Sequence, residues 1–135
     1  MRNSARESAM NIIYALQFNT DCIEHLTKKI YKQFKLEKEE DIAFADALIS
    51  TVSQNREELI AEIEKACHHY TQNRINPVDK SILLIAMAEI KYFDEIPAVV
   101  SVSEATGLAK KYSTEKSADF VNGVLAGVIN PKIEA

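Results

Sequence analysis

The 135-residue sequence contains few residues that interrupt regular structure or carry special chemistry: three glycines, three prolines, two cysteines and no tryptophan. With 47% apolar residues, this composition excludes a disordered or collagen-like chain and favours one helix-rich globular domain. No apolar run is long enough to cross a membrane, and the polar start MRNSARESAM lacks the apolar core of a signal peptide. We therefore expect a cytoplasmic protein that contacts no membrane.

Positive charge is also scarce, because 16 Lys and Arg stand against 20 Asp and Glu, for a net charge of −4. This balance excludes a basic nucleic-acid coat, so any nucleic-acid contact must use a local patch. Between residues 37 and 64, nine acidic residues face only Lys38 and Arg56. That surface would repel nucleic acid and could meet a basic protein, although a solvated surface is the simpler interpretation. Four lysines project from one side of a predicted helix, and we interpret them as a solvated face, with a phosphate-facing patch as the alternative: Lys28, Lys29, Lys32 and Lys35.

Residue types that bind metals or act as nucleophiles form no recognisable site. Cys22 and Cys67 occupy apolar helical positions without CxxC spacing, which predicts neither a disulfide nor a zinc site. His25, His68 and His69 include no HExxH pair, and no glycine belongs to a phosphate loop. Glu89 is interpreted as a hydrogen-bonded structural anchor, since no catalytic partner is evident. We therefore expect no metal, no cofactor and no enzymatic activity; the alternative is a small helical enzyme with an undetected site.

The stretch NPVDKSILLIAMAEI, residues 76–90, predicts a helix around which the rest of the chain packs. Asn76 is a suitable N-cap, Pro77 suits the first helical position, and Asp79 places a negative charge in the first turn. The next seven residues, 82–88, are all apolar. A helix that is apolar on every side must be covered on every side, so this segment is expected to be the central core helix.

Helical spacing of apolar residues predicts six further helices and no strand, so the fold class is all-α, a compact seven-helix bundle of two subbundles divided near Lys38. Ser4 is expected to cap the first helix, and Ser117 the last. Residues 98–100 are expected to form an extended connection into a helix that starts near residue 101 or 103. Residues 1–130 are assigned to a single domain, and 131–135 to a short tail.

Several strings of the sequence resemble the NusB family of bacterial transcription antitermination factors in order and spacing. They are DKSILLIAMAEI at 79–90, IP at 96–97, VSEA at 102–105, LAKKY at 108–112 and FVNGVL at 120–125. Arg6, Glu7, Ala9 and Tyr14 match the family's opening helix, and the middle third matches only in helical pattern. The resemblance implies an all-α, non-enzymatic RNA-binding adaptor. It implies binding of boxA-type RNA together with ribosomal protein S10 (NusE), in the RNA polymerase antitermination complex that supports ribosomal RNA transcription.

Carried over by position, the resemblance implies an RNA surface made by the opening segment and by the turn before the last helix: Arg2, Arg6, Lys110, Lys111, Lys116, Phe120 and Asn122. Arginine forks hold phosphates, and an aromatic ring can stack on an unpaired base. Core packing is the alternative for Phe120, and a solvated helix start is the alternative for the two arginines. Tyr14 and Asp79 are candidates for contacting S10, or for bracing helices.

Asn3 and Ser4 stand where the family commonly has further arginines, and this leaves one functional alternative open. The chain could be a protein-interaction module of the same fold with little RNA affinity of its own. Both a monomer and a homodimer are compatible with the apolar pattern.

Overall fold

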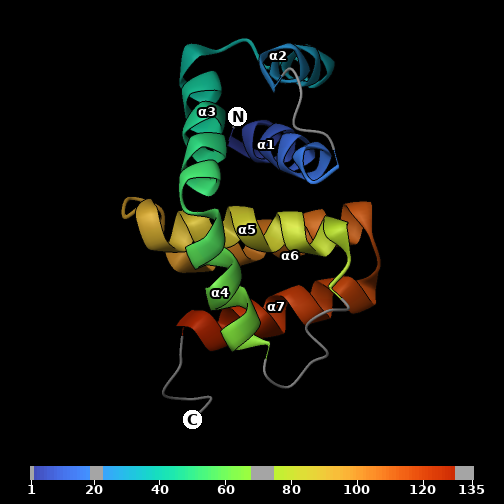
Figure 1. Cartoon of the computed structure of the whole chain (residues 1–135), viewed down its shortest axis with the longest axis vertical. Helices are drawn as coiled ribbons and strands as arrows, with labels where there is room; N and C mark the ends of the chain where they lie inside the picture. Colours follow the sequence, from blue (N-terminus) through green and yellow to red (C-terminus); the bar gives the residue numbers. More distant parts are fainter. Residues whose placement is uncertain (1, 19–22, 68–74, 130–135) are drawn as a thin grey trace.

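The computed structural model describes residues 2–18, 23–67 and 75–129. Across these ranges the chain forms seven α-helices and no strand, which confirms the all-α prediction (Figure 1). The predicted 131–135 tail lies outside the described residues. The helices are α1 (Arg2–Leu16), α2 (Ile23–Gln33), α3 (Glu39–Gln54), α4 (Arg56–Ala66), α5 (Pro77–Tyr92), α6 (Ala98–Tyr112) and α7 (Glu115–Ile129).

Helix α5 is the centre of the fold, as its sequence predicts. The Asn76 side chain accepts a hydrogen bond from the Asp79 backbone N–H at 2.8 Å, and Pro77 occupies the first turn. Every residue from Ser81 to Glu89 is buried. Helices α1, α3, α4, α6 and α7 all contact α5, which explains why no polar face is needed along this stretch.

The helices form two groups along the long axis of the molecule (Figure 1). Helices α1, α2 and α3 form the upper group, and α4, α6 and α7 form the lower group around α5. The expected division near Lys38 is wrong by one helix, because α3 packs against α1 more extensively than against α4. Helices α1 and α3 pack against each other, and both contribute large buried residues to the hydrophobic core, including Ile12, Ile13, Phe44 and Leu48.

Three expected helix starts differ in the structure. Helix α1 already begins at Arg2, so Ser4 lies inside the helix and its carbonyl accepts from Ser8 Oγ at 2.8 Å. Helix α6 begins at Ala98, directly after Pro97, whose φ of −60° leads the chain into the helix. The expected extended segment 98–100 is therefore the first helical turn. In α7 the capping side chain is Thr114, whose Oγ1 accepts from the backbone N–H of Ser117 at 3.0 Å.

Helix α2 ends in a left-handed turn at Lys35, whose φ is 54°. The N–H of Leu36 donates to the Tyr31 carbonyl at 2.8 Å, and the N–H of Lys35 donates to the Lys32 carbonyl at 3.1 Å. These two bonds define a Schellman motif, and the buried Leu36 side chain supplies its usual apolar contact. Lysine thus occupies a position that commonly holds glycine.

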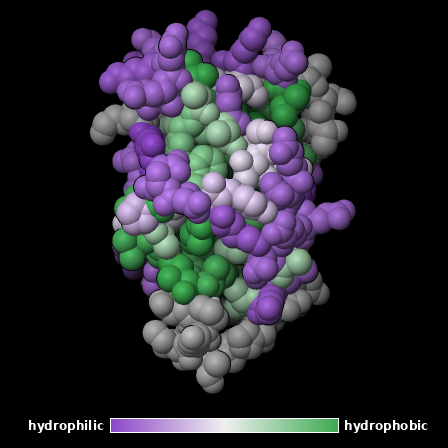
Figure 2. Space-filling model, turned by 90° about the vertical axis from the view of Figure 1, so that its left-hand side faces the viewer, coloured by the Kyte–Doolittle hydropathy of each residue, from purple (hydrophilic) through white to green (hydrophobic). Residues whose placement is uncertain are grey.

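The surface differs between the two ends of the molecule. On the face shown in Figure 2, hydrophilic side chains predominate at the upper end, with some apolar side chains among them, and apolar side chains gather at the lower left. Exposed apolar residues in the first turn of α6 include Val99 and Val100. Within the described ranges, no helix is both long and apolar enough to span a membrane.

Candidate nucleic-acid interface

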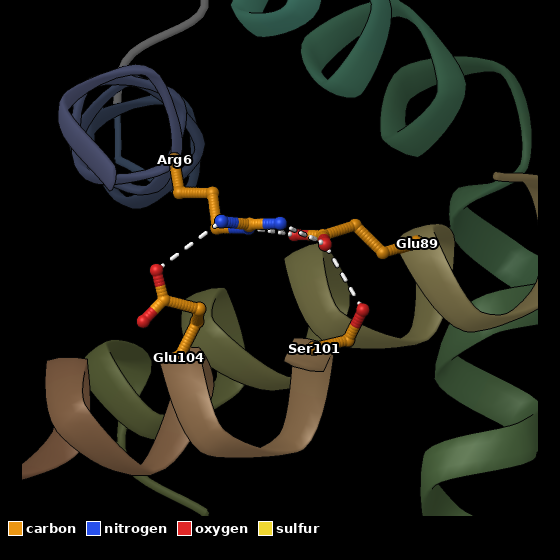
Figure 3. Close-up of polar contacts among 4 residues, drawn as sticks. All are labelled: Arg6, Glu89, Ser101 and Glu104. Atoms are coloured by element: carbon orange, nitrogen blue, oxygen red, sulfur yellow. Dashed lines mark hydrogen bonds and ion pairs between the residues drawn. The ribbon is translucent and has the colours of Figure 1, made fainter. Parts of the chain in front are cut away.

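A buried ion pair joins the start of α1 to the end of α5 and the start of α6 (Figure 3). Arg6 Nε and Nη2 donate to the two carboxylate oxygens of Glu89 at 2.7 and 2.9 Å. Ser101 Oγ donates to Glu89 Oε1 at 3.0 Å, and Arg6 Nη1 reaches Glu104 Oε1 at 3.2 Å. Only 3% of Arg6 and 1% of Glu89 are exposed. The paired fork satisfies both charges inside the protein.

This geometry favours a structural role for Arg6 over the predicted phosphate contact, which stays a prediction. A phosphate could reach its guanidinium only by breaking bonds to two carboxylates in a site closed to solvent. Arg6 instead holds the two helix groups together, and we leave it out of the candidate RNA surface. The interpretation of Glu89 as a hydrogen-bonded anchor is confirmed, and Arg6 and Ser101 are its partners.

Arg2, one turn earlier, is exposed. Its guanidinium carbon lies 4.8 Å from the centroid of the Phe44 ring, an arrangement that favours a cation–π contact. Arg2 also lines a surface hollow of about 320 Å³ with Lys38, Glu40 and Asp41. The ring orients the cation while leaving it accessible, so Arg2 remains a candidate for contacting phosphate.

On α6, the two predicted lysines differ in their surroundings. Lys110 is exposed, and Lys111 is 61% exposed at its side chain but pairs with Glu7 Oε2 at 2.6 Å. The hydrogen bond to Glu7 raises the pKa of Lys111. Tyr112 also donates its hydroxyl to Glu7, and burial followed by this bond raises the pKa of the phenol. These contacts tie α6 to α1, and they partly neutralise Lys111.

A second hollow, of about 490 Å³, opens where the start of α7 meets the start of α5. Its lining includes Lys116, Phe120 and Asp79. Lys116 is exposed and Phe120 is half-buried, so a cation and part of an aromatic face border the same opening. The hollow therefore combines the two groups that a nucleotide needs, a charge for phosphate and a ring for the base.

Asp79 is the unusual group in this hollow. It is only 5% exposed, and within the described part of the chain its Oδ1 accepts no hydrogen bond. Asn76 Nδ2 donates to the other oxygen at 3.2 Å. Burial raises the pKa of Asp79, while the hydroxyl of Ser117 and the amide of Asn76 lower it in part. An acceptor without a partner at the edge of a hollow is suited to an incoming donor.

The C-terminal end of α1 lies beside the start of α5. Gln17 Nε2 donates to the Pro77 carbonyl at 3.0 Å and to Ser81 Oγ at 2.7 Å. Tyr14, one turn before Gln17, is 37% exposed. The two residues predicted to contact a partner, Tyr14 and Asp79, therefore lie on adjoining helix ends.

Sequence reasoning missed Phe18, which is 65% exposed. Its ring meets that of Tyr14 edge-on, with centroids 5.2 Å apart. The four-residue spacing of the two aromatic residues was the available signal. The pair forms an exposed aromatic surface at the C-terminal end of α1.

The predicted RNA residues thus fall into separate places. Lys116 and Phe120 share the α5–α7 hollow with Asp79, and Asn122 is exposed on the same helix as Phe120. Arg2 lies twelve residues from Tyr14 along α1, or about 18 Å at the usual helical rise. Arg2 lines a different hollow and is not part of the α5–α7 hollow.

The described residues contain no group of three or more His, Cys, Asp or Glu that could hold a metal ion. Cys67 is fully buried, and burial raises the pKa of its thiol, which is unfavourable for a nucleophile. His25 is exposed on α2. Cys22, His68 and His69 lie outside the described residues.

Comparison with known proteins gives a consistent result. The NusB family model matches residues 3–130. The transcription antitermination protein NusB of Natranaerobius thermophilus is 35% identical over 96% of this chain and 94% of its own length. The protein of the same name from Acetivibrio thermocellus is 36% identical, over 98% and 90% of the two chains.

Solved structures agree with the sequence comparison. A crystal structure of the antitermination factors NusB and NusE in complex with dsRNA superposes with a TM-score of 0.84 at 25% identity, covering 94% of each chain. The solution structure of NusB from Aquifex aeolicus gives a TM-score of 0.80 at 25% identity, covering 98% of this chain and 90% of that one. The protein therefore belongs to the NusB family, and it is a NusB-like transcription antitermination factor.

Proposed function

We propose that the protein is an assembly factor that binds boxA-type RNA jointly with ribosomal protein S10 (NusE), without catalysing a reaction. The observation that carries this proposal is the α5–α7 hollow, where Lys116, Phe120 and the unpartnered oxygen of Asp79 border one opening. The similar structure that contains NusB, NusE and dsRNA supports the choice of both partners. Nascent RNA places this work in the cytoplasm, within the RNA polymerase antitermination complex.

The RNA side of the proposal uses the exposed cations. Lys116 would hold a phosphate at the mouth of the hollow, and Phe120 would stack with a base. Asn122 offers an amide that can donate and accept toward a base edge. Lys110 and Arg2 extend the surface along α6 and α1, whereas Lys111 contributes less because Glu7 neutralises it.

The protein side of the proposal uses the aromatic surface at the end of α1. Tyr14 and Phe18 expose adjoining rings, a composition typical of interface anchors. S10 is a basic ribosomal protein, and the net charge of −4 favours its approach. A lysine or arginine of S10 could also supply the donor that Asp79 Oδ1 lacks. A homodimer that used the same rings would compete with S10.

The test is a fluorescence-anisotropy titration of a boxA-like RNA and a scrambled RNA, with and without S10, at two salt concentrations. We expect S10 to increase the preference for the boxA-like RNA. Lys116→Ala should weaken binding and reduce the salt slope by about 0.7, the value for one single-strand phosphate. Lys65→Ala, which removes an exposed lysine of α4, is the matched control and should leave both quantities unchanged.

Two results would contradict the proposal in different ways. If S10 binds but neither protein nor complex prefers boxA-like RNA, the chain is a protein-interaction module of the same fold. If Lys116→Ala and Lys65→Ala behave alike while RNA still binds, the RNA lies elsewhere on the protein and the hollow has no part in it.

A further inference from the structure

The three lysines of α2 and Lys35, in the turn that follows it, form a second positively charged surface that the proposed boxA site does not use. We call Lys28, Lys29, Lys32 and Lys35 the lysine face. All four are exposed, and none forms an ion pair with a described residue. In contrast, Arg6, Lys91 and Lys111 are each bound to carboxylates. The lysine face therefore keeps its charge available on a protein that is acidic as a whole.

The orientation of α2 is set by its opposite side. Ile30 and Tyr31 are buried, and the Tyr31 hydroxyl donates to Asp46 Oδ1 of α3 at 2.6 Å. Burial, followed by that hydrogen bond, raises the pKa of the Tyr31 phenol. Because the tyrosine anchors the helix on α3, Lys28 and Lys32, one turn apart, must point to solvent. The lysines are thus held as a row and not as a mobile tail.

The chemistry of this face selects a polyanion. The apolar side of helix α2 packs against the protein core and so cannot enter a lipid layer, which excludes α2 as an amphipathic membrane anchor. Lysine ammonium groups act as point charges that contact phosphates without reading bases. The nearest acids in the sequence, Glu24 and Glu37, lie at the two ends of the face and interrupt none of its members. A nucleic-acid backbone fits this pattern.

The position of α2 connects the lysine face to the proposed RNA path. Lys38 follows Lys35 by three residues, at most about 11 Å of chain, and shares a hollow with Arg2. Helices α2 and α7 lie at opposite ends of the long axis, with α1 between them (Figure 1). A path along α1 from the α5–α7 hollow to Arg2 would bring RNA to Lys38 and toward the lysine face.

We propose that the lysine face binds the phosphates of RNA flanking the boxA-type segment, without sequence preference. This inference rests on the proposed function, because it extends the same RNA path. The lysine face would add phosphate contacts outside the boxA-type segment, so that affinity would increase with RNA length even where no base is recognised.

The test compares a core boxA-like RNA with the same RNA extended at both ends by unrelated sequence. The proteins are the wild type, a triple Lys28→Gln, Lys29→Gln, Lys32→Gln variant, and a triple variant with arginine at the same positions. Glutamine and arginine have helix propensities close to that of lysine, so the fold is preserved. Lys35 is left unchanged because of its left-handed backbone.

We expect the wild type and the arginine variant to bind the extended RNA more tightly than the core RNA, and the glutamine variant to bind both alike. Three lost phosphate contacts would flatten the salt slope for the extended RNA by about 2.1. Raising salt from 50 to 200 mM would then weaken the wild type about 20-fold more than the glutamine variant. Core RNA binding should be equal in all three proteins.

The outcomes separate this inference from the proposed function. If the core RNA binds but extension adds nothing, or if the glutamine variant keeps the gain, the lysine face is only a solvated surface and the inference is overturned. If extended RNA binds through the lysines while the core RNA does not bind, the inference stands and the proposed boxA site fails. If polyglutamate binds as tightly as extended RNA and through the same lysines, the partner is an acidic protein, which also overturns the RNA assignment.

Discussion

Removing one side of the Arg6–Glu89 ion pair should destabilise the protein severely. In Arg6→Met the Glu89 carboxylate, which is 1% exposed, keeps only the Ser101 hydroxyl as a donor. Loss of one partner from a buried pair costs about 3–5 kcal/mol, because the remaining charge stays desolvated. The free energy of unfolding of such a domain is about 5–15 kcal/mol, so the variant loses a large part of its stability. Urea unfolding followed by circular dichroism measures the change.

The double variant Arg6→Met, Glu89→Leu separates the charge from the packing. Similar apolar volume then replaces both buried groups of the pair. At this site only Glu104 keeps a charge, and 30% of its side chain is exposed. The double variant should be more stable than Arg6→Met alone, with a coupling energy of about 2–3 kcal/mol in the cycle. Lys91→Met, which breaks the solvent-exposed pair with Glu58, is the control and should have a much smaller effect.

Two results would refute this reasoning. Additive single variants would show that Arg6 and Glu89 do not depend on each other. The second result concerns RNA binding by Arg6→Met, measured at a temperature where this variant remains folded. The salt dependence of its RNA binding should equal that of the wild type, because the guanidinium of Arg6 is buried and not accessible to a phosphate. A slope reduced by about 0.7 would mean that Arg6 does contact RNA.

Two further predictions concern single backbone and side-chain positions. Lys35→Gly should raise the free energy of unfolding by about 0.5–1 kcal/mol, since glycine adopts the φ of 54° without the steric cost borne by lysine but loses more chain entropy. Lys32→Gly, inside the helix, should lower it, and a higher urea midpoint for Lys32→Gly would contradict the argument. Asp79→Asn should be more stabilising at pH 7 than near pH 4. Burial raises the pKa of Asp79 in the folded protein above its usual 3.8. The buried carboxylate therefore does not destabilise the protein at pH values below the pKa of the unfolded chain, where the group is protonated in both states. The destabilisation is complete once the pH has risen through the pKa of the folded protein. An equal effect of Asp79→Asn at both pH values would show that the carboxylate is not desolvated.

Local signals in the sequence determined most of the secondary structure. The cap, proline and acidic residue at 76–79 begin α5, and the apolar run that follows requires neighbours on all sides. These features act within one or two turns, so they can be read without knowing the fold. The start of α6 was misplaced because Val99 and Val100 suggest extended chain. Both are exposed in a first helical turn, where their branching costs little.

The family resemblance likewise came from the sequence, because strings such as FVNGVL keep their order and spacing along the chain. It named Lys116 and Phe120 as candidates for binding RNA and Asp79 as a candidate for contacting S10, and the structure shows that these three border one hollow. Whether they bind RNA and S10 stays a prediction that the titrations test.

Only the tertiary structure decided what each charged residue can do. Arg2 and Arg6 lie one turn apart and look alike in sequence, yet Arg2 is exposed over Phe44 while Arg6 is buried against Glu89, 83 residues away. Burial and long-range pairing depend on how the helices pack against each other. The residues next to an arginine in the sequence do not indicate that it will pair with a carboxylate far along the chain. The same reason separates Lys111, which is paired with Glu7, from the lysine face, whose four members form no ion pair with a described residue. The sequence determined which residues are charged, and the packing of the helices determined which of these charges are exposed for contact with a partner.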